Sequence, residues 1–169
     1  FLMFSFTLLI NMEQLFKAYY KSPIGFIELI ASNKGLRSLY FSSKKGENDT
    51  HEFLAESQKQ LHEYFTAMRK EFDLPFDLIG TEFQLKVWNT LLNIPFGKTA
   101  SYLDLANLVA TAKHTRAVGL ANGANPISII LPCHRVIGKN GKLVGYGGGL
   151  ERKQWLLDFE SESRQLSMF

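Results

Sequence analysis

Three short runs of aromatic and aliphatic residues lie close together near the start of the chain, and turn-forming residues separate them. The runs cover residues 15–20, 25–31 and 36–41, and the breaks between them contain Ser22-Pro23 and the sequence SNKG at 32–35. Short runs bounded by Ser, Pro, Asn and Gly are typical of β-strands joined by tight turns. The pattern therefore predicts a small antiparallel sheet, either a hairpin or three strands, at the start of the fold.

The segment after these strands changes to helical spacing. A polar loop at residues 44–49 comes first. The residues that then recur with the period of an α-helix are Leu54, Ser57, Leu61, Tyr64 and Phe65. One helix covering the sheet would complete a compact unit, so residues 12–76 are predicted to form an α+β domain with a supporting role. Residues 75–80 are interpreted as a linker to a second domain at residues 80–169.

The second domain is predicted to be mostly helical. Thr81 is a suitable N-cap for a first helix, residues 95–97 (PFG) end it, and Ser101 opens the next. Residues 111–114 separate that helix from a short one at 115–122, which is the helix-turn-helix plan of many DNA-binding proteins. Many helical hairpins bind nothing, so the spacing alone leaves DNA binding open. The predicted fold class is α+β, with an N-terminal sheet and covering helix and a C-terminal helical domain that contains this element.

An apolar run at residues 125–137 is predicted to include a strand, and the single cysteine of the chain, Cys133, lies just past that strand near the end of the run. The sequence GKNG at 138–141 predicts a hairpin turn, because Asn-Gly suits type I′ geometry. GYGGG at 145–149 predicts a flexible loop where the backbone can approach a ligand closely. A last helix is predicted over residues 150–159.

Composition limits the classes of protein to which this chain can belong. A single cysteine excludes an intramolecular disulfide and a cysteine-rich zinc site, and it fits a reducing compartment. The net charge is −1 over residues 1–80 and +4 over residues 81–169, which permits a polyanionic partner for the second domain. The apolar residues 1–10 are too few to span a bilayer and lack the features of a secretory signal. We interpret residues 1–11 as a non-native or mis-assigned leader, with Met12 as the true start.

Polar residues near the end of the apolar run are candidates for chemistry. Cys133 is followed by His134 and Arg135, and a base or a positive charge favours the reactive thiolate. An isolated free cysteine is more often buried and inert. Adjacent side chains of a strand point to opposite faces, so His134 needs a bend or a bridging water to act on Cys133. Glu160, one turn after Leu156 at the end of the last helix, is either a solvated carboxylate or the group that orients His134.

A series of sequence blocks between residues 80 and 160 resembles, in the same order, the pattern of the O6-alkylguanine-DNA alkyltransferases. The blocks are GTEFQ (80–84), VW (87–88), IPFGKT (94–99), SY (101–102), RAVG (116–119), NP (125–126), PCHRV (132–136) and GYGGG (145–149). The PCHR sequence alone would be a modest match, whereas the ordered set is specific. It covers about half of the chain, and the N-terminal half resembles the family only in general plan.

The resemblance implies a catalytic role for five residues of this sequence. Cys133 would accept the alkyl group, His134 would deprotonate it through a water, and Glu160 would hold the imidazole. Tyr102, otherwise interpreted as a core tyrosine, would donate a hydrogen bond to the flipped purine. Asn125 would brace the helix-turn-helix element against the active-site strand.

The resemblance also implies a DNA interface in the minor groove. Arg116 would fill the gap that the flipped base leaves in the stack. The other residues implied in binding the lesion or the DNA are Ser101, Tyr102, Arg135, Val136, Tyr146, Gly147 and Gly148. The expected partner is double-stranded DNA that contains alkylated bases. The protein is expected to act as a cytoplasmic monomer without a cofactor. No metal is expected, because the sequence lacks the N-terminal cysteines that hold zinc in some members of the family.

The reaction implied by the resemblance is the repair of O6-alkylguanine by direct, irreversible and stoichiometric transfer of the alkyl group to Cys133 after base flipping. The width of the pocket would decide whether O4-alkylthymine is also accepted. Two other interpretations of the residues are open. A cysteine hydrolase could use the same Cys, His and Glu for acyl transfer with turnover. A DNA-binding regulator without enzymatic activity could use residues 115–122 to recognise a sequence.

Overall fold

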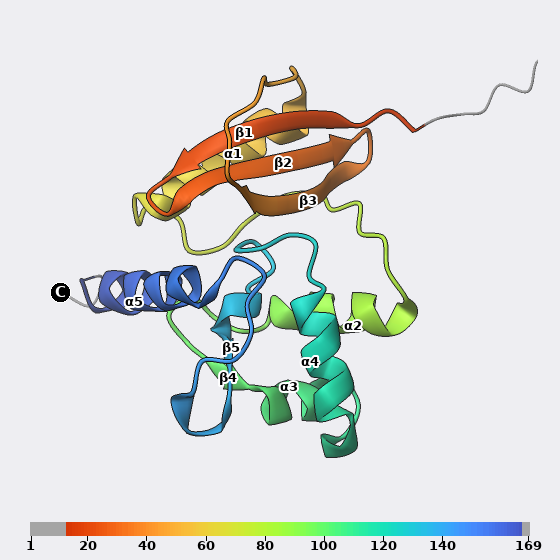
Figure 1. The fold of residues 1–169 in the computed structure, drawn as a ribbon, viewed down its shortest axis with the longest axis vertical. Helices are drawn as coiled ribbons and strands as arrows, with labels where there is room; N and C mark the ends of the chain where they lie inside the picture. The colour runs from red at the N-terminus through yellow and green to blue at the C-terminus, as the bar shows by residue number, and fades with distance from the viewer. Residues whose placement is uncertain (1–12, 167–169) are drawn as a thin grey trace, which may run out of the picture.

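The computed structural model describes residues 13–166, and the leader predicted at residues 1–11 lies outside them. A three-stranded sheet with one helix is followed by a mostly helical part (Figure 1). The helices are α1 (Glu52–Phe65), α2 (Glu82–Leu91), α3 (Tyr102–Val109), α4 (Thr115–Gly123) and α5 (Leu150–Leu166), the strands are β1 (Phe16–Ser22), β2 (Gly25–Ser32), β3 (Gly35–Ser42), β4 (Ala100–Ser101) and β5 (Val136–Ile137), and the short 3₁₀ helices are η1 (Ala112–His114), η2 (Cys133–Arg135) and η3 (Lys139–Gly141). The predicted α+β class is confirmed.

The N-terminal sheet has the strand order β1-β2-β3, and both pairs of neighbouring strands are antiparallel. Alternate side chains of the central strand are fully buried, as at Ile27 and Leu29, which is the pattern of a sheet with one covered face. The helix α1 packs against all three strands and contributes Leu54 and Leu61 to the same core. In Figure 1 this helix runs behind the sheet, so the predicted covering helix is confirmed.

The helical part begins with two helices whose first turns are fixed by capping boxes. Thr81 caps α2 together with Gln84, and Ser101 caps α3 together with Asp104. The helices α2, α3 and α4 pack against one another, and the indole of Trp88 on α2 donates to a backbone carbonyl of α4 at 2.8 Å. The short turn η1 joins α3 to α4, so the predicted pair of helices with a tight connection is present.

The prediction of a strand within residues 125–137 is wrong for most of that run. Ile127 forms one isolated bridge with Leu39 of β3, and Ile129 has a positive φ of 72°, so the chain turns before it reaches η2. Only its end forms a strand, β5, which pairs in parallel with β4. The run is apolar because it is buried between the sheet and the helices. Its backbone groups are satisfied by turns and by the side chain of Asn125 rather than by a ladder.

Two other predictions for the C-terminal segment differ from the structure. The residues of the predicted hairpin turn form the short 3₁₀ helix η3, in which the amide of Gly141 donates to the carbonyl of Gly138 at 3.2 Å; Asn140 and Gly141 have positive φ values of 63° and 77°, but within residues 13–166 no paired strands flank this turn. The last helix, predicted to end at Phe159, continues to Leu166 instead, and Glu160 therefore lies within α5. The residues that extend it contain neither Gly nor Pro, so no helix-ending residue stops the helix at the predicted point.

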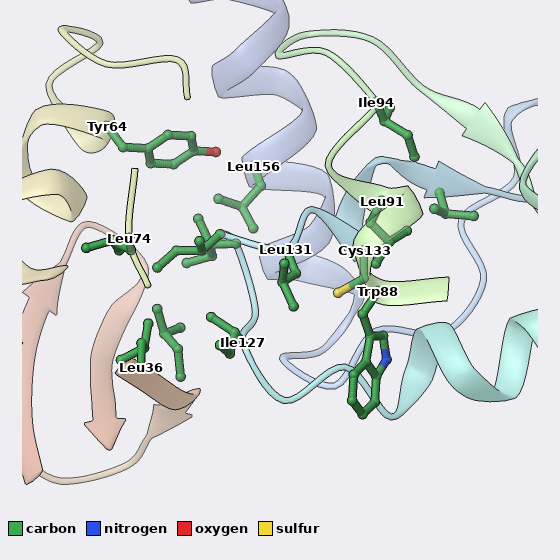
Figure 2. Close-up of a cluster of buried hydrophobic side chains, with 14 of the residues drawn as sticks. Leu36, Tyr64, Leu74, Trp88, Leu91, Ile94, Ile127, Leu131, Cys133 and Leu156 are labelled. Atoms are coloured by element: carbon green, nitrogen blue, oxygen red, sulfur yellow. The ribbon is translucent and has the colours of Figure 1, made fainter. Parts of the chain in front are cut away.

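The sheet domain and the helical part share one continuous core. Figure 2 shows Leu36 and Leu74 of the N-terminal part close to Ile127, Leu131 and Leu156 of the second part. Two backbone hydrogen bonds, of 2.8 and 3.1 Å, also join β3 to the segment that follows α4. The sheet domain therefore packs directly behind the segment that leads to Cys133.

Gly35, at the start of β3, lies where no side chain fits. Its φ is +155°, and a Cβ atom there would be 2.5 Å from the carbonyl oxygen of Pro75. Because backbone atoms cannot rotate away, we expect Gly35→Ala to lower the free energy of unfolding by roughly 2–4 kcal/mol. Urea denaturation measures this change. Gly123→Ala, where a Cβ atom meets nothing within 4 Å, is the control and should leave the midpoint nearly unchanged. Equal losses in both variants would contradict the explanation.

Candidate active site

Cys133 is the first residue of η2, and its side chain lines a small cavity. The residue is 5% exposed. The other residues around the cavity are Tyr40, Asn122, Gly123, Asn125, Ser128, Gly145, Tyr146 and Gly147. The volume is about 40 Å³, whereas a cavity that holds one water molecule needs about 10–15 Å³. The cysteine therefore faces a cavity, although that cavity is too small for a nucleobase in this conformation.

The turn that delivers Cys133 is held by Asn125. The carboxamide of Asn125 donates to the carbonyl of Leu131 at 2.7 Å and accepts from the amide of Ile127 at 3.0 Å. The amide of Cys133 donates to the same carbonyl of Leu131, also at 2.7 Å. Asn125 follows directly after α4, so it links this helix to the cysteine. The structure thus places Asn125 where a brace was expected, although the segment it braces is a turn and not a strand.

The Cys133 thiol is protonated at neutral pH. Burial raises its pKa from the usual 9.0 to about 11, although the hydrogen bond of Asn125 and the charge of Lys153 lower it in part. A thiolate is the reactive form of cysteine. Reaction at neutral pH therefore requires a base that removes the proton as the sulfur attacks.

His134 and Glu160 form a buried pair in which Nε2 of the imidazole lies 2.8 Å from Oε1 of the carboxylate. Burial lowers the pKa of His134, and the charge of Glu160 only partly opposes this effect, so the imidazole is neutral at pH 7. A carboxylate can only accept, so the single imidazole proton lies on Nε2. Nδ1 has no hydrogen-bond partner within residues 13–166, and it is left as the basic nitrogen.

Arg135, which was predicted to contact the lesion or the DNA, is 6% exposed, and its side chain binds Glu160. Its Nε and Nη2 atoms donate to the two carboxylate oxygens, each at 2.9 Å, and Nη1 donates to the carbonyl of Ile94 at 2.7 Å. Burial alone would raise the pKa of Glu160, but His134 and Arg135 hold it well below its usual range. A buried carboxylate requires a compensating cation, and this requirement draws the guanidinium inward.

Three of the residues predicted to contact the lesion or DNA surround the short strands β4 and β5. Ser101 accepts from the amide of Asp104 at 3.1 Å and serves as the N-cap of α3. Tyr102 donates its hydroxyl to the carbonyl of Val144 at 3.0 Å, and burial raises its pKa, so it stays a donor. Val136 is fully buried within β5. The Ser101 hydroxyl donates to the carboxylate of its own capping box at 2.7 Å, whereas the Tyr102 hydroxyl donates to a backbone carbonyl that a substrate acceptor could replace.

The residues of the loop at 145–149 lie partly at the cavity and partly against the sheet domain. Tyr146 and Gly147 line the cavity with Cys133. Gly148 lies against the sheet domain, where a Cβ atom would be 2.6 Å from the ring of Phe41. Arg152 donates to the carbonyl of Gly148 at 2.9 Å and lies 4.5 Å from the centre of the Phe41 ring. The loop predicted to be flexible is thus anchored to the sheet domain on one side.

Arg116 is exposed in the first turn of α4. Within residues 13–166 its guanidinium has no carboxylate or hydrogen-bond partner, which leaves it free to contact another molecule. Leu120, one turn later on the same helix, is 71% exposed. This helix therefore presents a cation and an apolar side chain to the solvent.

Lys153 is a residue of the site that sequence reasoning missed. It is fully buried, and its ammonium donates to the carbonyls of Val136, Val144 and Gly145 at 2.7, 3.0 and 3.2 Å. These contacts join β5 to the loop beside the cavity. A lysine on a terminal helix is normally interpreted as solvated. The available signal was its position one turn before Leu156, a residue expected to face the core.

Two more polar residues near the site were not predicted. Asn122, at the end of α4, is 4% exposed and lines the cavity, and its side-chain oxygen has no hydrogen-bond partner in the described part of the chain. Tyr64 was assigned only to the apolar face of the covering helix. Its hydroxyl, however, donates to Glu160 at 2.7 Å. No sequence signal identifies this contact, because the two residues are 96 positions apart.

Among residues 13–166 there is no group of three or more His, Cys, Asp or Glu side chains that could hold a metal ion. No helix in that range combines the length and the apolar character needed to cross a membrane.

Two family profiles match this chain in sequence order. The first, described as the ribonuclease-like domain of 6-O-methylguanine DNA methyltransferase, matches residues 15–78. The second, described as the DNA binding domain of 6-O-methylguanine DNA methyltransferase, matches residues 82–162.

Similar proteins carry corresponding names. The methylated-DNA–protein-cysteine methyltransferase of Methanosarcina acetivorans is 44% identical over 86% of this chain and 98% of that protein. Its namesake from Mycolicibacterium paratuberculosis is 45% identical over 87% of this chain and 93% of that protein. The crystal structure of Mycobacterium tuberculosis O6-methylguanine methyltransferase superimposes with a TM-score of 0.81 at 42% identity, covering 89% of this chain and 94% of the other. A structure of the Mycobacterium tuberculosis protein OGT in complex with DNA superimposes with a TM-score of 0.80 at 43% identity, covering 87% of this chain and 93% of the other.

The positive charge of Lys153 lowers the pKa of Cys133. We therefore expect Lys153→Met, which keeps an unbranched side chain of similar length but removes the charge, to raise the pKa of Cys133 above about 11. Because Cys133 is the only cysteine, NMR of protein carrying a labelled cysteine Cβ follows its titration alone. Lys139→Met, at an exposed position of η3, is the control and should leave the titration unchanged. An equal or lower pKa in Lys153→Met would rule out this electrostatic role.

Proposed function

The chain belongs to the family of methylated-DNA–protein-cysteine methyltransferases, and on that premise we propose that it repairs O6-alkylguanine in DNA by irreversible transfer of the alkyl group to Cys133. The observation that supports this most directly is the position of Cys133 in a cavity, next in sequence to a histidine whose Nε2 is held by Glu160. The named activity of the relatives supplies the reaction, and this arrangement supplies the nucleophile and the base.

In the proposed reaction the thiol loses its proton as the sulfur attacks the alkyl carbon. Nδ1 of His134 takes this proton through a bridging water, and Glu160 stabilises the resulting imidazolium through Nε2. The sulfur–carbon bond forms while the bond from that carbon to O6 of the base breaks, and the electron pair stays on the base. Tyr102 donates a hydrogen bond to the departing purine, which becomes intact guanine once it is protonated.

The product explains why one chain would repair one base. The sulfur ends as a thioether, which has no carbonyl group that water could attack. An acyl-enzyme thioester, in contrast, is open to hydrolysis and permits turnover. The transfer is therefore expected to be stoichiometric, and each protein molecule is consumed.

The burial of Cys133 makes base flipping a necessary step of this proposal. An alkylated base inside a duplex cannot reach a buried sulfur, so it must swing out of the helix at a cost of a few kcal/mol. The cavity must then widen to admit the base, and Tyr146 and Gly147 are among the residues that line it. Arg116, exposed on α4, is in a position to take the place of the missing base in the stack. We place α4 in the minor groove of double-stranded DNA, as the family resemblance implies.

Further features of the proposal concern the state of the protein in the cell. We propose that it acts as a monomer, because one chain contains the complete Cys133, His134 and Glu160 arrangement. We propose the cytoplasm as its location, where a reducing environment keeps a single cysteine available for reaction.

The transfer is tested by incubating the protein with an oligonucleotide that contains O6-methylguanine and then measuring its intact mass. We expect one methyl group per chain, on Cys133, with no further reaction when more lesion is added. Cys133→Ala is expected to bind the lesion but to gain no methyl group. Burst kinetics followed by turnover on an ester or amide would favour a cysteine hydrolase. Tight discrimination among undamaged sequences that survives Cys133→Ala would favour a regulator.

Arg116→Ala tests the flipping step separately from the chemistry. Since Arg116 is remote from the proton transfer in this mechanism, the variant should react more slowly with lesion-containing duplex DNA but at a near-normal rate with free O6-alkylguanine base. Second-order rate constants for the two substrates give the comparison. Lys139→Met serves as the charge-matched control. An equal loss of rate on both substrates would refute the stacking role.

A further inference from the structure

The sheet domain contributes one polar atom to the buried relay behind Cys133. Tyr64 belongs to α1, and its side chain is fully buried. Its hydroxyl donates to Oε1 of Glu160 at 2.7 Å, across 96 positions of sequence. Figure 2 shows this hydroxyl pointing from α1 toward α5, the helix that carries Glu160.

The surroundings of Tyr64 are otherwise aromatic. The rings whose centres lie between 5.1 and 5.9 Å from the Tyr64 ring belong to Phe65, Phe72, Phe96 and Phe159. A phenylalanine would pack equally well among these rings. The hydroxyl therefore has one contact to explain its presence, and that contact is the carboxylate of Glu160.

Both oxygens of the Glu160 carboxylate accept hydrogen bonds. Two other donors bind the same oxygen as Tyr64. Oε1 accepts from Tyr64, from Nε2 of His134 at 2.8 Å and from Arg135 at 2.9 Å. Oε2 accepts from Arg135 at 2.9 Å and from the amide of Gly97 at 3.0 Å. Because Tyr64 and His134 bind the same oxygen, the contact from Tyr64 holds the oxygen that faces the imidazole in place. The hydroxyl also draws electron density from the oxygen that faces the imidazole.

We propose that Tyr64 is a positioning residue for the Cys133 reaction, through which the sheet domain fixes the Glu160 carboxylate and, with it, the orientation and basicity of the His134 imidazole. The inference rests on the proposed function. The other groups that act on this pair are Arg135 from η2, Lys153 from α5 and the amide of Gly97. All of these remain in place when only the hydroxyl of Tyr64 is removed.

Removal of the hydroxyl has a directional consequence. In Tyr64→Phe, Oε1 keeps two donors instead of three and becomes a stronger acceptor for the imidazolium. The pKa of His134 should rise by about one unit, the size expected from one hydrogen bond to a charged group. A base with a higher pKa is protonated at a higher pH, so the acidic limb of the rate profile should move upward. At pH values below the pKa of His134, the rate of Tyr64→Phe should be about tenfold lower than that of the wild type.

The experiment measures single-turnover methyl transfer from an O6-methylguanine oligonucleotide between acidic and alkaline pH, for the wild type, Tyr64→Phe and Tyr20→Phe. Tyr20→Phe is the matched control, because Tyr20 stacks on Phe65 in the same cluster and lies in β1, away from Glu160. Its profile should coincide with that of the wild type. Replacement of Tyr64 by 3-fluorotyrosine, a stronger donor, should move the limb in the opposite direction.

Imidazole ¹⁵N NMR of the unreacted proteins gives the second readout, which does not depend on methyl transfer. In Tyr64→Phe the titration of His134 should move to higher pH, with the proton still on Nε2 of the neutral form. An unchanged titration and an unchanged limb, with only reduced stability, would overturn the inference and leave the proposed function intact. If the wild type gains no methyl group, the proposed function fails, and the NMR titration still decides whether Tyr64 tunes His134.

Discussion

The buried carboxylate of Glu160 is the group on which the arrangement of the site depends. A carboxylate without partners in the interior would lose its charge or destabilise the fold. Here the carboxylate, which belongs to α5, accepts from Tyr64 of α1 and from the amide of Gly97 in the loop after α2. It also accepts from His134 and Arg135, both of η2. The positions of these elements are therefore coupled, and the imidazole beside Cys133 is oriented by the same contacts that stabilise the interior.

The resting site combines a protonated nucleophile with a neutral base. Burial raises the pKa of the Cys133 thiol to about 11, and burial lowers the pKa of His134. Such a cysteine is a poor nucleophile toward ordinary reagents, because very little thiolate is present at neutral pH. Lys153 favours the thiolate form of Cys133 and Glu160 favours the imidazolium form of His134, so both charges of the proposed proton transfer have a compensating group nearby. This preorganisation suits a protein that reacts once, with one kind of substrate.

The N-terminal sheet domain contacts the site from three directions. Tyr40 lines the cavity, Phe41 packs on Gly148 of the adjacent loop, and Tyr64 reaches the carboxylate. The isolated bridge between Leu39 and Ile127 holds the segment that leads to Cys133. Although this domain was predicted only to support the fold, it contributes one residue to the lining of the cavity and one hydrogen bond to the carboxylate that binds His134. The distinction between a supporting domain and a catalytic one does not hold at this interface.

The sequence by itself determined the local structure and the candidates for chemistry. Strand and helix periods and the caps at Thr81 and Ser101 depend on neighbouring residues, so they could be predicted, and the resemblance identified the candidate nucleophile and base. Burial and long-range partners were decided only by the tertiary structure, because they depend on contacts between distant segments. The run before Cys133 is packed on all sides and forms turns. Arg135 is buried because it compensates the charge of Glu160, and the ammonium of Lys153 is buried because three carbonyl oxygens accept its hydrogen bonds.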